Sequence, residues 1–106
     1  MNLPKVITDN QNNLIILCQQ HNVRKLYLFG SAVTSNFNDE SDIDLIVDIA
    51  EKDPVEKGLL LLNFWDETEN LLKRKVDLLS DKKIDNPYFN KSIEATKQLI
   101  YERKGA

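Results

Sequence analysis

The chain has 106 residues, which is enough for one compact domain over residues 1–106 and leaves little for a second. Charged residues make up 29% of it and the formal net charge is −3, which argues against direct binding of nucleic acid or of an anionic membrane. Because Cys18 is the single cysteine and His21 the single histidine, the composition excludes an internal disulfide and a multi-cysteine or multi-histidine metal site. The chain has no apolar run of about 20 residues and no signal-peptide pattern, so we expect a soluble cytoplasmic protein.

Helix and strand patterns alternate along the chain. Apolar residues at i, i+3, i+4 and i+7 indicate helices, and short aliphatic or aromatic runs indicate strands. The patterns predict, in chain order, helix, strand, short helical turn, strand, helix, strand and helix at about residues 9–21, 25–29, 31–41, 42–49, 54–73, 75–79 and 87–103. Asn86–Pro87, a capping residue followed by proline, is the expected start of the last helix. This order is typical of an α/β (α+β) fold with a small mixed sheet flanked by helices.

Capping residues predict where two of the helices begin. Either Thr8 or Asp9 can accept a hydrogen bond from a free amide in the first turn of the first helix. The long helix has the stronger signal, with Asp53 as the cap, Pro54 at the first helical position and Glu56 at the reciprocal capping position.

Two carboxylates, Asp42 and Asp44, interrupt the apolar strand predicted over 42–49, which should be covered by helices on both faces. At positions i and i+2 they share a face of the strand, about 6–7 Å apart. No lysine or arginine between Lys25 and Lys52 can neutralise them. A bound divalent cation would stabilise the pair, and simple solvation at the mouth of a strand is the alternative.

Asp77 and Gly30–Ser31 can complete such a site. If the predicted strand over 75–79 lies beside the first two acids, Asp77 brings a third carboxylate, as two-metal phosphoryl transfer requires; otherwise it is a polar residue at an exposed edge. Gly30–Ser31 directly follows the first strand, where glycine lets backbone amides approach a phosphate, although an ordinary turn has the same residues. The whole pattern G-S-x10-D-x-D matches by chance on the order of one time in a thousand in a chain of this length.

Leu28-Phe29-Gly30-Ser31, together with Ser41-Asp42-Ile43-Asp44-Leu45, resembles the minimal nucleotidyltransferases (the MNT group) of the DNA polymerase beta superfamily. The resemblance implies a polymerase-beta-like nucleotidyltransferase fold that transfers AMP from ATP and releases pyrophosphate. It implies that nucleotide is bound by Gly30, Ser31 and Ser41, and that two Mg²⁺ ions are held by the catalytic residues Asp42, Asp44 and Asp77. One departure is that many relatives carry arginines after G-S, whereas residues 32–40 have none, so the cation that clamps the phosphates must come from elsewhere.

The resemblance also implies a partner. Stand-alone members often act as antitoxins that attach AMP to a tyrosine of a HEPN-type toxin, an all-α RNase. The alternative is a non-catalytic module that neutralises a helical partner through Leu60, Phe64 and Leu71, one of two apolar stripes on the long helix; the other is Leu59, Leu62 and Trp65. Transfer to a small molecule such as an aminoglycoside is a weaker alternative, because no second domain is left to form an acceptor pocket. The sequence does not decide whether the protein forms a homo-oligomer.

Other polar or reactive residues have simpler interpretations. Cys18 and His21 share a helix face; Cys18 is expected to be a small core residue and His21 a satisfied histidine at the edge of the core, and neither is expected to be a ligand. Asp48 is expected at the surface of a strand end. The basic run Lys73-Arg74-Lys75 is expected to complement the dipole at a helix C-terminus.

Overall fold

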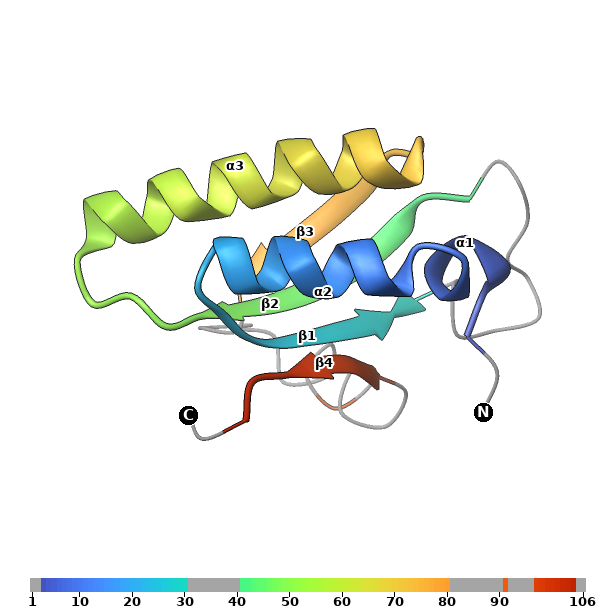
Figure 1. The fold of residues 1–106 in the computed structure, drawn as a ribbon, viewed down its shortest axis with the longest axis horizontal. Coiled ribbons are helices and arrows are strands. Elements are labelled where there is room, and N and C mark those ends of the chain that lie inside the picture. Colours follow the sequence, from blue (N-terminus) through green and yellow to red (C-terminus); the bar gives the residue numbers. More distant parts are fainter. Residues whose placement is uncertain (1–2, 31–40, 81–90, 92–96, 105–106) are drawn as a thin grey trace.

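The computed structural model describes residues 3–30, 41–80, 91 and 97–104 (Figure 1). Its elements in chain order are α1 (Lys5–Thr8), α2 (Gln11–Gln20), β1 (Val23–Phe29), β2 (Ile43–Ile49), α3 (Pro54–Leu72), β3 (Val76–Ser80) and β4 (Gln98–Glu102). None of the described helices is both long and apolar enough to cross a membrane. The predicted short turn over 31–41 lies almost wholly outside the described residues.

The described strands form one mixed sheet in the order β3-β2-β1-β4. β1 runs antiparallel to both β2 and β4, and β2 runs parallel to β3. A parallel pair needs a crossover connection, and α3 provides it between β2 and β3. The predicted small mixed sheet flanked by helices is therefore confirmed.

The chain returns to the sheet as a strand near its end, and the prediction of a helix up to about residue 103 is wrong. β4 pairs with β1, so that Leu99 lies opposite Tyr27, and Ile100 is buried in the core. Aliphatic and aromatic side chains pack well on a pleated surface, and here that packing overrides a spacing that also fits a helix. The predicted start of that helix at Asn86–Pro87 lies outside the described residues.

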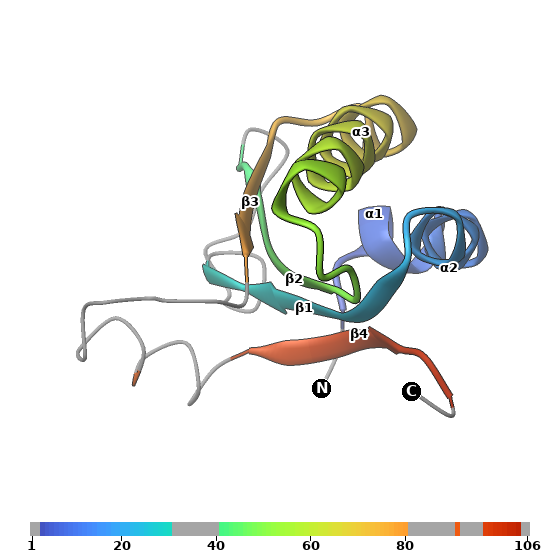
Figure 2. The same cartoon turned by 90° about the vertical axis from the view of Figure 1, so that its left-hand side faces the viewer.

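All three described helices cover the same face of the sheet (Figure 2). Side chains that alternate along the strands point toward them and form the core with Phe64 of α3 and Leu14 of α2. The buried strand residues of this core include Leu28, Ile43, Leu45, Val47 and Val76.

The opposite face of the sheet, called here the far face, carries Asp44, Ile46 and Asp48 of β2. Helical coverage of both faces of β2, as predicted from its apolar sequence, is not found among the described residues. Ile46 is nevertheless buried there next to Phe29, in a second and smaller apolar cluster with Tyr27 and Leu79 packed against it. The far face therefore combines apolar and acidic side chains.

The start of α2 differs from the prediction. The capping position is Asn10, and its side chain makes no capping hydrogen bond; neither Thr8 nor Asp9 caps the helix. The Thr8 hydroxyl instead donates to the carbonyl of Lys5 at 3.2 Å, within the short helix α1 that the sequence patterns did not predict.

The start of α3 follows the prediction more closely. Asp53 is the N-cap and accepts a hydrogen bond from the Val55 amide at 3.0 Å, with Pro54 in the first turn. The Asp53 amide donates the reciprocal hydrogen bond to the Glu51 carboxylate at 3.2 Å. Glu51 thus takes the position that the sequence assigned to Glu56.

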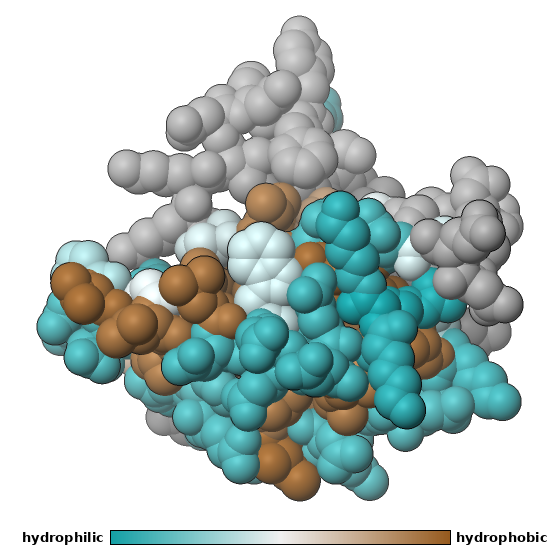
Figure 3. Space-filling view, turned by 90° about the horizontal axis from the view of Figure 1, so that it is seen from above, coloured by the Kyte–Doolittle hydropathy of each residue, from teal (hydrophilic) through white to brown (hydrophobic). Residues whose placement is uncertain are grey.

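The two apolar stripes of α3 have different environments. The stripe proposed as a binding surface packs into the core, since Phe64 is fully buried and Leu60 and Leu71 pack against the core cluster, so that proposal is wrong. Trp65 is also engaged, because its indole N–H donates to the Val76 carbonyl at 2.7 Å. Exposed apolar side chains instead gather toward the start of α3 (Figure 3): Val55, Leu59 and Leu62.

Thr68 lies in the core face of α3 with its hydroxyl buried and without a hydrogen-bond partner among the described residues. An unsatisfied buried hydroxyl costs about 1–3 kcal/mol. We expect Thr68→Val, which keeps the shape and removes the hydroxyl, to raise the free energy of unfolding by about 1 kcal/mol. Urea unfolding measures it, with Thr68→Ser as the matched variant that keeps the hydroxyl and should lose stability. A destabilised Thr68→Val protein would contradict this expectation.

Candidate functional site

The parallel register of β2 and β3 brings two of the predicted acids together. Asp44 of β2 is the direct partner of Asp77 of β3, and both project from the far face. Asp44 is half-buried and Asp77 is exposed. Asp77 acts on Asp44 through its charge and through side-chain hydrogen bonding, and both raise the pKa of Asp44. A proton or a cation between two facing carboxylates would relieve the repulsion between them.

Electrostatics disfavours the charged form of Asp44. The pKa of Asp44 is raised to about 6, most of all by burial, and then by the charge of Asp77, the hydrogen bond to Asp77 and the charge of Asp42. Desolvation and like charges both favour the protonated acid. Asp44 therefore interacts with both of the other acids named from the sequence.

Asp42 precedes β2, and the backbone on either side of it is tied to the start of β3. The Arg74 guanidinium donates from Nη1 to the Ser41 carbonyl at 2.7 Å, and the Ile43 amide donates to the Lys75 carbonyl at 3.0 Å. The sequence interpretation of Arg74 as a helix C-terminal cation missed this contact. The sequence feature that could have indicated this contact is the position of Arg74, three residues before Asp77 and directly before the strand predicted over residues 75–79.

Gly30 lies against the Asp44 carboxylate. It directly follows Phe29, the β1 partner of Asp44, and its φ is +71°, which is unfavourable for a residue with a side chain. A Cβ at this position would collide with Oδ2 of Asp44 and lie 3.1 Å from its Cγ. Glycine thus allows the backbone to approach the acidic pair closely. Ser31, the second residue of the predicted turn, lies outside the described residues.

The donor set fits a hard cation in part. Asp44 and Asp77 supply oxygen ligands of the kind that Mg²⁺ takes, typically one or two carboxylates with substrate phosphates. Within residues 3–30, 41–80, 91 and 97–104, however, no three His, Cys, Asp or Glu side chains are grouped closely enough to hold a metal ion. The geometry therefore supports a two-carboxylate site, and a role for Asp42 as a third ligand stays a prediction.

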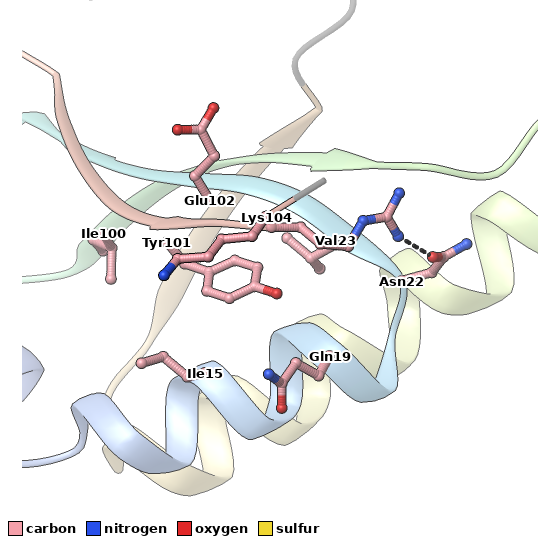
Figure 4. Close-up of a pocket in the computed structure, with 9 residues that line it drawn as sticks. Ile15, Gln19, Asn22, Val23, Ile100, Tyr101, Glu102 and Lys104 are labelled. Atoms are coloured by element: carbon pink, nitrogen blue, oxygen red, sulfur yellow. Dashed lines mark hydrogen bonds between the residues drawn. The ribbon is translucent and has the colours of Figure 1, made fainter. Parts of the chain in front are cut away.

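A separate cleft of about 630 Å³ lies between α2 and β4 (Figure 4). Ile15 and Gln19 of α2 face Tyr101 and Lys104 across it, and the Arg103 guanidinium beside it donates to the Asn22 side chain at 2.7 Å. Its lining includes the first residue of β1, which pairs with the last residue of β2. The cleft is therefore at the opposite end of the sheet from the acidic pair.

The other reactive side chains do not join the site. Cys18 is fully buried and burial raises its pKa to about 12, so its thiol is not a nucleophile at neutral pH. His21 is buried between the Leu17 carbonyl, 2.8 Å from its Nδ1, and the Glu67 carboxylate, 2.6 Å from its Nε2. Both are structural, as predicted. Asp48 is half-buried, with its carboxylate 3.7 Å from the Arg24 guanidinium.

Residues 12–106 match the family model of polymerase beta nucleotidyltransferases. Among curated proteins, MJ1379 of Methanocaldococcus jannaschii, named as a candidate protein adenylyltransferase, is 39% identical over 88 residues, which cover 81% of this chain and 83% of that protein.

Solved structures share the fold. A toxin–antitoxin structure with AMP-PNP superposes with a TM-score of 0.67 at 20% identity, covering 90% of this chain and 75% of that chain. The complex of a tri-AMPylated HEPN toxin of Shewanella oneidensis with its MNT antitoxin gives a TM-score of 0.57 at 20% identity, covering 92% and 73%. At this sequence identity, these likenesses show that the fold is shared.

Proposed function

Since the chain belongs to the polymerase beta nucleotidyltransferase family, we propose that it transfers AMP from ATP to a hydroxyl of a protein partner. The observation that supports this most directly is the contact of Asp44 with Asp77 beside Gly30. A half-buried carboxylate with a raised pKa, opposite a second acid and next to a backbone that only glycine fits, suits a metal-bound nucleotide.

The chain's residues divide the proposed reaction between them. Asp44 and Asp77, with Asp42 beside them, would hold Mg²⁺, which neutralises phosphate charge and orients the α-phosphate for in-line attack. Gly30 brings its backbone close to the phosphates, and Ser31 and Ser41 are proposed to bind the nucleotide with it. The partner hydroxyl forms a bond to the α-phosphorus while the bond to the β-phosphate oxygen breaks and pyrophosphate leaves. Asp77, the more exposed member of the pair, accepts the hydroxyl proton.

The proposed acceptor is a tyrosine of a HEPN-type toxin, which would make the protein an antitoxin. Two observations support this choice: MJ1379 is named for protein adenylylation, and the solved structure of similar fold from Shewanella oneidensis is an MNT antitoxin bound to an AMPylated toxin. Tyrosine presents a hydroxyl at the end of a long side chain, which can reach an exposed acidic pair without a deep acceptor pocket.

Label transfer tests the proposal. The full chain is incubated with its co-expressed partner and with ATP labelled on the α- or the γ-phosphate, with Mg²⁺ or with EDTA. We expect the partner to gain label only from α-labelled ATP and only with Mg²⁺. Label from γ-labelled ATP would indicate a kinase, and no label from either nucleotide would overturn the proposal.

A purely binding function is the second candidate, favoured by the exposed apolar side chains at the start of α3: Val55, Leu59 and Leu62. It predicts that the protein neutralises its partner in cells even when Asp42→Ala and Asp44→Ala abolish label transfer. Loss of neutralisation in that double variant favours catalysis.

The metal site can be tested without an acceptor. In EDTA at pH 7.5, above the pKa of about 6 for Asp44, like-charge repulsion destabilises the folded state. Asp77→Asn removes part of this repulsion. Because the pair is partly solvated, we expect the free energy of unfolding to rise by about 1 kcal/mol, which corresponds to about 4–8 °C in Tm. Excess Mg²⁺ should raise the Tm of the wild type and not that of the variant.

Asp66→Asn, on the exposed side of α3, is the matched control and should leave both the Tm in EDTA and the response to Mg²⁺ unchanged. An Asp77→Asn protein that responds to Mg²⁺ like the wild type would contradict the assignment of Asp77 as a metal ligand.

A further inference from the structure

The far face carries a lysine level with the acidic pair. In the sheet, Phe29 of β1 is the partner of Asp44, and the preceding residue, Leu28, is the partner of Gln98 in β4. Lys97 directly precedes Gln98, so it lies beside the end of β1. One row across the sheet thus begins at Lys97 and ends at the acidic pair.

An aromatic ring orients the Lys97 side chain. The ammonium nitrogen lies 4.2 Å from the centroid of the Tyr27 ring. Tyr27 packs against the far-face cluster of Phe29 and Ile46, so the ammonium is on the same face as the acids. An aromatic ring attracts a cation through its quadrupole.

The separation suits a phosphate chain. Lys97 and Asp44 are two strands apart, which is about 10 Å between their backbones. Both side chains project from the same face, and Gly30 follows the strand between them. A triphosphate held by metal at the acids and passing over the Gly30 turn would extend toward the Lys97 ammonium.

Lys25 and Arg74 are two other cations near this face among the residues that the structure describes. Lys25 projects from the same face but lies four residues before the end of β1, about 13 Å along the strand, with its ammonium 3.6 Å from the Glu102 carboxylate. Arg74 donates to the Ser41 carbonyl at the start of β2. Residues 32–40, which follow Gly30–Ser31 in the sequence, contain no lysine or arginine.

We propose that Lys97 binds the β- and γ-phosphates of the nucleotide and supplies the positive charge that residues 32–40 lack. This rests on the proposed nucleotidyl transfer. The ammonium makes a charge-assisted hydrogen bond to phosphate oxygen, and it screens the charge that develops on the pyrophosphate leaving group.

Calorimetric binding of Mg-ATP and of AMP to the full chain tests the proposal, with the variants Lys97→Ala, Lys97→Arg and, as a matched control on the same face, Lys25→Ala. We expect Lys97→Ala to weaken Mg-ATP binding at least about tenfold and to leave AMP binding unchanged. Lys97→Arg should restore most of the affinity, and Lys25→Ala should bind like the wild type. In label transfer, the KM for ATP should rise more than kcat falls.

The outcomes distinguish a failure of the role proposed for Lys97 from a failure of the proposed nucleotidyl transfer. If the wild type does not bind Mg-ATP, the proposed transfer fails and the role of Lys97 fails with it. If the wild type binds Mg-ATP and Lys97→Ala binds it equally well, the role of Lys97 alone is overturned. Equal weakening of AMP and Mg-ATP would also overturn it, because Lys97 would then support the fold and not the phosphates.

Discussion

Replacing Asp44 with Asn is expected to lower AMP transfer at least about 1000-fold, equivalent to about 4 kcal/mol of transition-state stabilisation. Asp44 is the register partner of Asp77, interacts with both other acids and lies against Gly30. Asparagine keeps the shape of the side chain and removes the charge that would hold a cation. Because burial and repulsion penalise that charge, the variant should fold at least as stably as the wild type, so the loss cannot be ascribed to unfolding.

Asp48→Asn is the matched control. Asp48 lies on the same strand and the same face as Asp44, is half-buried as well, and interacts with Arg24 instead of another acid. We expect the Asp48→Asn variant to keep the rate of transfer within about threefold of the wild-type rate. The variant loses only one surface ion pair, and such a pair contributes little free energy. The label-transfer assay with α-labelled ATP measures both variants. Transfer that survives in Asp44→Asn would place the chemistry elsewhere on the molecule.

The acidic pair could be predicted from the sequence only conditionally. Alternation along a strand places Asp42 and Asp44 on one face whatever the fold. The pairing with Asp77 depends on which strands are neighbours, in which direction and in which register. A single sequence does not contain that information directly; the family resemblance supplied it, and the parallel pairing of β2 with β3 agrees.

The features that the sequence patterns did not predict depend on contacts between distant parts of the chain or on the path of a loop. The spacing of residues 98–102 fits a helix and a strand almost equally well, and the free edge of β1 decides for the strand. Arg74 belongs locally to the end of α3, but its guanidinium reaches a carbonyl 33 residues earlier in the chain. Glu51 and Glu56 are both close to Asp53 in sequence, and the Asp53 amide donates to Glu51. In each case the local pattern allowed two outcomes and a distant partner, or the path of the loop, selected one.

Replacing Gly30 with alanine is expected to impair both folding and transfer. Its φ of +71° costs a residue with a Cβ about 1–2 kcal/mol, and the added methyl would collide with the Asp44 carboxylate. Either the turn or Asp44 must move. A shift of about 1 Å at a reacting centre lowers rates about 100-fold, so we expect at least that loss of label transfer in the fraction of protein that remains folded.

Gly58→Ala separates these effects from the general cost of a glycine substitution. Gly58 is in the interior of α3, where a Cβ would meet no atom within 4 Å, so alanine should stabilise the helix by up to about 1 kcal/mol and leave transfer unchanged. The same methyl group is thus expected to have opposite effects on stability at the two positions and to abolish transfer at only one. If Gly30→Ala were as stable and as active as Gly58→Ala, a side chain would fit at residue 30. The close approach of the backbone to Asp44, on which the proposed nucleotide site depends, would then not be required.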